Sequence, residues 1–265
     1  MNQPSRYLPA AARRQHILAL IERRGFAKVT YLANYFGISE VTARADLEAL
    51  AETNAIQRVH GGAISGLGSA TLERTFDVAA GEAAAEKVRI GAAAADLIKP
   101  HQVVMLDVGT TTTAIARELP RREQLADITV VTNALNIALE LETAYPRVTV
   151  VVTGGTLRPA QHSLVDPMAD ALLSRVRADI AFIGCNGVSV ESGISNLNFP
   201  EADVKRRLLA AAARRVLVAD SSKIGVVRSS RVGPLSDVDL LITTKEADPK
   251  QLDLVRKTGL ELLIV

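Results

Sequence analysis

A run of glycine and threonine, from Asp107 to Thr113, has the make-up of an anion-binding turn. It follows a short apolar segment and comes where a helix is expected to begin. A glycine lets the backbone approach a ligand, hydroxyls donate hydrogen bonds, and the free N–H groups of a first helical turn point the same way. The residues that we expect to contact an anion here are Asp107, Gly109, Thr110, Thr111 and Thr112.

The same run also has a purely structural interpretation, which is a threonine-capped helix preceded by a turn glycine. It matches neither the Walker A loop nor the G-x-G-x-x-G pattern, so the sequence does not indicate a nucleotide.

Polar residues follow several other apolar segments. For Glu201 and Lys205, which are four residues apart on one predicted helix, the ordinary interpretation is an exposed ion pair worth ~0.5 kcal/mol. Taken together, however, the polar residues that follow the apolar segments suit a small ligand with one phosphate and several hydroxyls. Lysines balance the phosphate charge, and carboxylates accept from hydroxyls. The candidates that they add to the ligand site are Asn133, Gly154, Gly155, Glu201, Lys205 and Lys223.

An α/β domain is expected to position these residues. Continuous apolar strands that alternate with helices indicate a mostly parallel, Rossmann-like sheet covered on both faces, and ligands of such sheets bind at the carboxyl ends of the strands. We expect strands at 103–106, 128–131, 148–152, 180–183, 216–218, 240–242 and 262–265, and helices near 82–98, 112–119, 134–143, 167–175, 200–213 and 249–256.

The N-terminal part of the chain has the pattern of a winged helix-turn-helix. A first helix is expected at 11–24, and a short second helix is buried through Leu32, Ala33 and Phe36. Gly37 is placed for a tight turn with positive φ, and Ser39 for the cap of a third helix. A plain helical subdomain is the alternative interpretation.

The third helix turns Ala43, Leu47 and Leu50 to the core, which leaves its other face for the major groove of DNA. Arg44 can bind either a phosphate or a guanine edge. The segment 56–64 is expected to form a short β-wing that turns at paired glycines. The residues that we expect at DNA are Ser39, Glu40, Thr42, Arg44, Arg58, His60 and Gly61.

Charge and composition agree with a DNA partner. Residues 1–64 hold eight lysines and arginines against five acidic residues, a net charge of +3, whereas the remainder has a net charge of −1. Tryptophan is absent and phenylalanine and tyrosine number nine, which disfavours single-strand and RNA binding by base stacking.

No cofactor, metal or membrane partner is indicated by the sequence. The four histidines lack metal-ligand spacing, and Cys185 lies in an apolar run, where an inert buried thiol is expected. No apolar run approaches 18 residues and the N-terminus lacks the apolar core of a signal peptide, so we expect a cytoplasmic protein. The expected domains are the helix-turn-helix at 10–64, a Gly/Ser-rich linker at 65–72 and an effector-sensing α/β domain at 73–265.

An ordered set of motifs resembles the DeoR-type bacterial transcription regulators over almost the whole chain. Besides the helix-turn-helix, the matching pieces are Arg58 with His60-Gly61-Gly62-Ala63, Asp107 with Gly109-Thr110-Thr111, Thr132-Asn133, Gly154-Gly155, Glu201-Ala202 with Lys205, and Asp220-Ser221-Ser222-Lys223.

The resemblance implies a repressor of carbohydrate metabolism with a C-terminal domain similar in fold to ribose 5-phosphate isomerase. Its implied partners are a double-stranded DNA operator, a phosphorylated sugar or related metabolite that releases the operator, and further copies of the chain in a dimer or tetramer. In such a protein Asp107, Gly109 and the threonines would bind the phosphate and hydroxyls, with Lys205 and Lys223 completing the site. An isomerase-like enzyme and an activator are the alternatives, but fold likeness does not carry activity.

Overall fold

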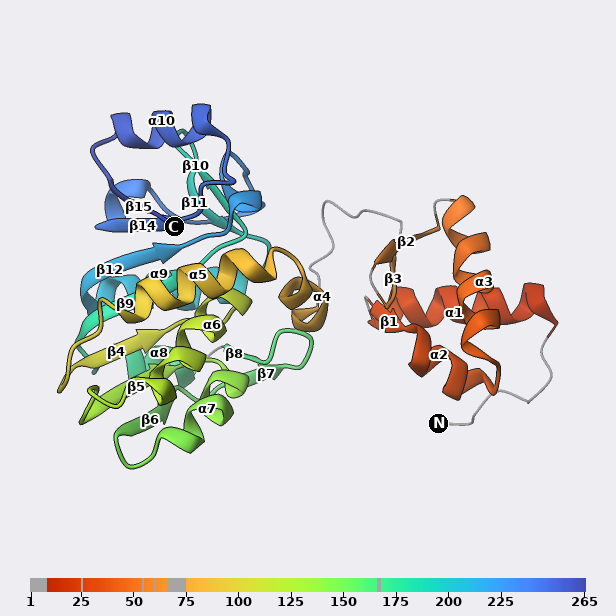
Figure 1. The fold of residues 1–265 in the computed structure, drawn as a ribbon, viewed down its shortest axis with the longest axis horizontal. Helices are drawn as coiled ribbons and strands as arrows, with labels where there is room; N and C mark the ends of the chain where they lie inside the picture. The colour runs from red at the N-terminus through yellow and green to blue at the C-terminus, as the bar shows by residue number, and fades with distance from the viewer. Residues whose placement is uncertain (1–8, 25, 54, 60, 66–74, 166–167) are drawn as a thin grey trace. The chain divides into compact units, whose positions relative to one another are not determined.

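The chain forms two compact units, Met1–Gly81 and Glu82–Val265 (Figure 1). The structure, a computed structural model, describes residues 9–24, 26–53, 55–59, 61–65, 75–165 and 168–265. Most of the predicted linker at 65–72 lies outside these ranges. Ser65 is the exception, and it ends a strand of the first unit.

The first unit is the predicted winged helix-turn-helix. Three helices pack on a core in which Ile17, Ile21, Leu32 and Leu47 are fully buried. The turn after the second helix contains Gly37 at φ 64°, the left-handed conformation that its position requires. The elements are α1 (Ala10–Arg24), β1 (Phe26–Lys28), α2 (Val29–Phe36), α3 (Glu40–Glu52), β2 (Ile56–Val59) and β3 (Gly62–Ser65).

The wing has one more strand than the sequence predicts. β3 pairs with β2 as expected, and its other edge pairs with the three-residue β1. A Cβ atom on Gly62 would lie 2.3 Å from the carbonyl oxygen of Ala27, so the close approach of β1 to β3 requires glycine there. Gly61 makes the turn of the wing at φ 81°.

The second unit is built on a seven-stranded sheet in which every pair of neighbours is parallel. Its order is β15-β14-β12-β9-β4-β5-β6, and it contains all seven predicted strands. The strands are β4 (Val103–Leu106), β5 (Ile128–Thr132), β6 (Val148–Val152), β9 (Ala178–Gly184), β12 (Ala212–Val218), β14 (Leu240–Thr243) and β15 (Glu261–Ile264).

Helices cover both faces of this sheet, as the continuous apolar strands predict (Figure 1). Residues of α5, α6 and α7 share one core with one side of the strands, and residues of α8, α9 and α10 share another core with the other side. The helices are α4 (Phe76–Gly81), which precedes this unit, and α5 (Ala84–Ala95), α6 (Thr110–Glu118), α7 (Leu135–Leu141), α8 (Met168–Leu173), α9 (Phe199–Ala211) and α10 (Pro249–Lys257).

Small antiparallel strands, which the sequence did not indicate, form two further sheets apart from the central one. β7 (Thr156–Arg158) pairs with β8 (Ser163–Val165), and β11 (Gly193–Asn196) lies between β10 (Gly187–Ser189) and β13 (Ser230–Gly233). Strands of three or four residues are too short to show an alternating pattern. They contribute several polar side chains of the site described below.

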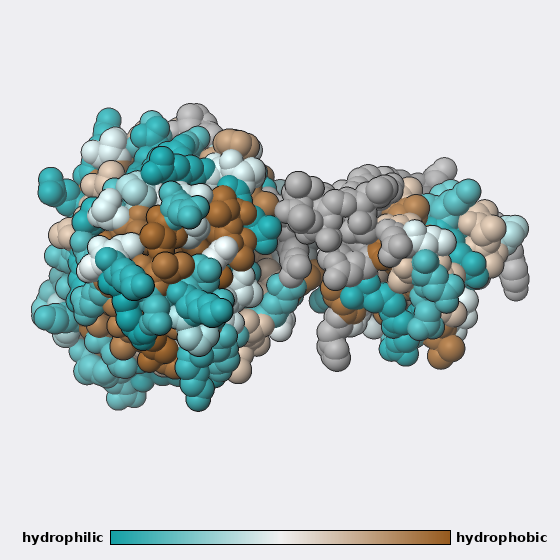
Figure 2. Space-filling view, turned by 90° about the horizontal axis from the view of Figure 1, so that it is seen from above, coloured by the Kyte–Doolittle hydropathy of each residue, from teal (hydrophilic) through white to brown (hydrophobic). Residues whose placement is uncertain are grey.

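Hydrophilic residues cover much of the second unit in the face seen in Figure 2, and hydrophobic residues gather near its centre. Within the described ranges, no helix combines the length and apolar character needed to cross a bilayer.

Candidate functional site

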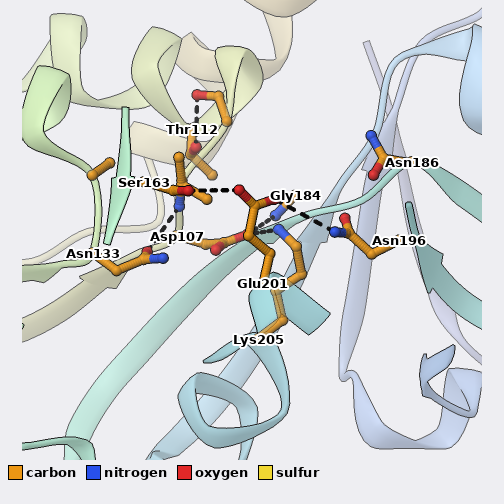
Figure 3. A network of polar contacts seen from close by, with 12 residues as sticks. Asp107, Thr112, Asn133, Ser163, Gly184, Asn186, Asn196, Glu201 and Lys205 are labelled. Atoms are coloured by element: carbon orange, nitrogen blue, oxygen red, sulfur yellow. Dashed lines mark hydrogen bonds and ion pairs between the residues drawn. The ribbon is translucent and has the colours of Figure 1, made fainter. Parts of the chain in front are cut away.

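The centre of the site is Asp107, which follows β4 directly and is fully buried. Its Oδ2 accepts hydrogen bonds from Nζ of Lys205 on α9 and, at 3.1 Å, from the backbone N–H of Gly184 at the end of β9 (Figure 3). The parallel register brings these ends together, since Leu106 is opposite Phe182. Residues far apart in the chain therefore meet at the carboxyl edge of the sheet.

The exposed ion pair between Glu201 and Lys205, the ordinary interpretation of their spacing, is wrong. Both side chains are buried, because this face of α9 packs on the sheet and not in solvent. Lys205 pairs with Asp107 across the fold.

Burial raises the pKa of Asp107 to about 6, although the neighbouring Lys205 ammonium opposes the shift. Burial also acts to lower the pKa of Lys205, but the carboxylates of Asp107 and Glu201 outweigh it and leave that pKa raised. At neutral pH the two groups are therefore an ion pair. Oδ1 of Asp107 is buried and has no hydrogen-bond partner among the described residues, so it can accept from a ligand hydroxyl.

Glu201 is held by side chains from the small antiparallel strands. Its Oε1 accepts from Ser163 Oγ at 2.6 Å, and its Oε2 lies 3.5 Å from Nδ2 of Asn196 (Figure 3). Oε1 also accepts from the guanidinium of Arg158. Sequence reasoning missed Arg158, Ser163 and Asn196. They lie on β7, β8 and β11, whose shortness leaves no pattern to point to them.

The expected anion-binding turn begins α6. Gly109 is the N-cap residue at φ 152°, and the hydroxyls of Thr112 and Thr113 donate to its carbonyl oxygen at 3.0 and 2.7 Å. The hydroxyl of Thr112 therefore stabilises the helix start, which is the role that the structural interpretation gives it. The N–H groups of Thr110 and Thr111 lie in the first turn and have no acceptor within the helix, so they can donate to a ligand.

Asn133, Gly154 and Gly155 support the shape of the site. Asn133 is fully buried, accepts from the N–H of Val108 at 3.0 Å and lies 3.4 Å from the carbonyl oxygen of Leu164. Gly154 and Gly155 have φ of 72° and 122°, and a Cβ atom on Gly155 would lie 2.4 Å from the carbonyl oxygen of Val165. These residues fix the loops after β4 and β6.

Lys223 lies at the end of a short 3-10 helix, η3 (Ser221–Lys223), after β12. It is half-buried, and no ion pair of its ammonium is found within the part of the chain that the structure describes. Cys185 is partly and not fully buried. Burial raises the pKa of its thiol to about 12, against the opposing charges of Lys205 and Lys223, so this thiol stays protonated. β12 pairs with β9 in parallel, with Val218 opposite Gly184, so the loop that carries Lys223 lies at the same edge of the sheet as Gly184.

The candidate DNA-contacting residues lie on α3 and the wing. Ser39 caps α3 by accepting from the N–H of Thr42 at 3.1 Å, and Arg44 is exposed and pairs with Glu40 at 2.7 Å. Arg58 of the wing pairs with Glu48 at 3.0 Å. Exposed pairs of this kind are weak, so both guanidinium groups can exchange their partner for a phosphate. His60 lies outside the described residues.

A buried carboxylate fixes the position of α3. Asp46 accepts from Arg13 at 2.6 Å and from Arg14 at 3.0 Å, which joins α3 to α1. Val41, on the outer face of α3, is 73% exposed. The outer face therefore offers an apolar contact, suited to a thymine methyl group, beside Thr42 and Arg44.

Two family models match the chain. The DeoR-like helix-turn-helix domain matches residues 13–66 and the DeoR C terminal sensor domain matches residues 82–245.

Relatives match over nearly their whole length. The HTH-type transcriptional regulator GlpR of Haloferax volcanii is 33% identical over 96% of this chain and 97% of its own. The putative aga operon transcriptional repressor of Escherichia coli O157:H7 is 31% identical over 96% and 93%, and the HTH-type transcriptional repressor GlcR of Bacillus subtilis is 32% identical over 94% and 93%. Among solved structures, ribose 5-phosphate isomerase A of Methanocaldococcus jannaschii aligns with a TM-score of 0.39 at 19% identity, over 52% of each chain.

Proposed function

The chain belongs to the DeoR family of helix-turn-helix transcriptional regulators, and from this premise we propose that it is a repressor released from its operator by a phosphorylated sugar. Its relatives are named as transcriptional regulators, so the chain is a DNA-binding regulator and not an isomerase. The relatives from Escherichia coli O157:H7 and Bacillus subtilis are named as repressors, which supports the sign of the proposed regulation.

The observation that carries the choice of effector is the unpartnered Oδ1 of Asp107, buried beside Lys205 and next to the start of α6. A carboxylate oxygen with no donor suits a ligand hydroxyl, and the first turn of a helix suits a phosphate. Asp107 and Lys205 balance each other, so the phosphate charge is met by the N-terminus of α6 and by Lys223. A small molecule with one phosphate and at least one hydroxyl has the required chemistry.

We propose that Ser39, Glu40, Thr42, Arg44, Arg58, His60 and Gly61 form the DNA-contacting surface. α3 is the helix that enters the major groove, and the wing contacts the backbone. Two copies of the chain, in a dimer or within a tetramer, would present two such helices to successive major grooves of a palindromic site.

Release requires that the effector binds the operator-free arrangement more tightly than the operator-bound one. A coupling free energy of ~1 to 3 kcal/mol lowers operator affinity about 5- to 150-fold.

The experiment first selects duplexes from a random pool with the full chain, and then measures affinity for the selected duplex with and without sugar phosphates. Ribose 5-phosphate, fructose 6-phosphate, glucose 6-phosphate and glycerol 3-phosphate serve as probes, each paired with its dephosphorylated form. The proposal expects weaker DNA binding with one phosphorylated probe and no change with its dephosphorylated form. If the DNA affinity is unchanged with every probe, the effector half of the proposal is wrong. A failure to select any duplex would overturn the operator half.

A further inference from the structure

The loop that carries Lys223, at 220–226, is hydrogen-bonded to the first turn of α5. Glu86 accepts from the N–H of Ser221 at 2.9 Å and from its hydroxyl at 3.0 Å. The same carboxylate accepts from the hydroxyl of Thr244, a fully buried residue that follows β14. One side chain of α5 therefore joins the ends of β12 and β14.

The next residue of α5, Lys87, reaches the same loop from a buried position. Its Nζ donates to the carbonyl oxygen of Glu82 at 2.5 Å and lies 4.0 Å from Oδ2 of the buried Asp220. Asp220 in turn accepts from the N–H of Ser222 at 3.1 Å, which shapes η3. Lys87 therefore connects Asp220, at the start of the loop that carries Lys223, with the backbone ahead of α5.

That backbone is where the second unit begins. Glu82 is its first residue, directly after α4, and Ala83 has φ 48° and ψ 34°, a left-handed conformation that is uncommon for alanine. Such a conformation persists only where surrounding contacts hold it, and the contact of Lys87 with Glu82 is one of them. The chain segment that leads to the first unit therefore starts at a turn whose backbone conformation is unfavourable and is stabilised by Lys87.

The charges of Asp220 and Lys223 both act on Lys87. Burial lowers the pKa of Lys87, Asp220 opposes the shift, and the ammonium of Lys223 adds to it. An anion bound by Lys223 would offset the repulsion between the two lysines. Lys87 contacts both Asp220 of this loop and the carbonyl oxygen of Glu82, so a change at the loop reaches the backbone ahead of α5.

We propose that Glu86 and Lys87 are positioning residues that transmit phosphate binding at Lys223 to the Glu82–Ala83 turn, and so to the chain that leads to the DNA-binding unit. This inference rests on the proposed function, because it takes the phosphate site to include Lys223. Neither residue contacts the effector, and both act through the loop that carries Lys223.

The test is hydrogen exchange of the full-length protein, with inorganic phosphate as the probe and chloride at equal ionic strength as the reference. At about ten times the dissociation constant of phosphate, exchange of the wild-type loop 220–226 slows by about tenfold. The inference expects slower exchange at 82–87 as well. In Lys87→Met and in Glu86→Gln, phosphate should slow the loop alone. Glu86→Gln keeps the shape of the side chain, so the comparison survives if Lys87→Met fails to fold. Lys99→Met, which removes an exposed lysine after α5, is the matched control and should respond like wild type.

The outcomes separate the inference from the proposed function. If phosphate slows the loop but not 82–87 in wild type, or slows both segments in the two variants, the inference is overturned and the phosphate site stands. If phosphate slows neither segment in wild type, the phosphate site is absent and both proposals fall.

Discussion

Lys205 of α9 donates to Asp107 at the end of β4, so two residues 98 positions apart form a buried ion pair at the carboxyl edge of the sheet. The pair leaves Oδ1 of Asp107 without a donor and lies beside the first turn of α6. Several consequences of this relationship, and of the contacts on α3, can be measured.

Removing only the lysine should be costly. Lys205→Met leaves a buried carboxylate without its ammonium partner, and we expect the free energy of unfolding of the second unit to fall by ~3 to 5 kcal/mol. Asp107→Asn combined with Lys205→Met should recover much of this loss, because it leaves no unpaired charge. Urea unfolding of both variants checks the prediction, and a double variant as unstable as Lys205→Met would contradict it.

The stability of the second unit should depend on pH through Asp107. Burial raises the pKa of this carboxyl from 3.8 to about 6, so the folded chain holds the proton more tightly than the unfolded chain. Its contribution is therefore fully present below about pH 4 and is lost as the pH rises through about 6, a loss of ~3 kcal/mol.

Urea unfolding of wild type and Asp107→Asn between pH 4 and 7 measures this effect as a difference. The variant cannot titrate at residue 107, so its unfolding free energy should rise relative to that of wild type across this interval. Parallel pH profiles would show that the carboxyl has no raised pKa.

Arg44 on the outer face of α3 should matter for DNA binding. Arg44→Ala is expected to weaken operator binding by ~1 to 3 kcal/mol if the guanidinium contacts a base, with relaxed preference at one position of the site. A phosphate contact would instead weaken all duplexes alike and lower the salt dependence by about one charge. Gel shifts over a range of salt concentrations distinguish the two.

Arg256→Ala is the matched control, since Arg256 has the same 53% side-chain exposure and a similar helical ion pair but lies on α10. An Arg44→Ala variant that binds as tightly as the control would remove Arg44 from the DNA-contacting surface.

The cap of α3 should contribute measurably to the stability of the first unit. Ser39→Ala removes the acceptor of the Thr42 N–H, and we expect a loss of ~1 kcal/mol in the free energy of unfolding. Ser39→Asp restores an acceptor and should recover most of it. Thermal unfolding followed by circular dichroism provides the measurement. Equal melting temperatures for Ser39→Ala and wild type would mean that the cap is not stabilising.

The sequence predicts the architecture well where the signal is long or periodic. Apolar runs such as 103–106 and 128–131 became neighbouring parallel strands, and Leu32 and Phe36 became core residues of the first unit. β1 and β7 were missed because three residues carry no period.

The sequence predicts a candidate site at the carboxyl ends of the strands, but it does not predict which of its residues contact one another. The motifs place Asp107, Glu201 and Lys205 in one predicted site. The spacing of Glu201 and Lys205 alone, however, does not show which face of α9 packs on the sheet. Only the folded sheet shows that Lys205 meets Asp107, and that Ser163 and Arg158 hold Glu201. Contacts between distant segments depend on register and topology, which short motifs do not encode.

The most direct test of the central claim is a thermal-shift measurement of the full chain with the four sugar phosphates and their dephosphorylated forms, repeated with Thr111→Ala and Lys223→Ala. The account predicts a shift with one phosphorylated sugar, worth ~2.7 kcal/mol at about 100 times its dissociation constant, that is lost without the phosphate and in both variants. Two results would contradict a phosphate site at α6 and Lys223. One is that no sugar phosphate stabilises the wild-type chain, and the other is that both variants are stabilised as much as wild type.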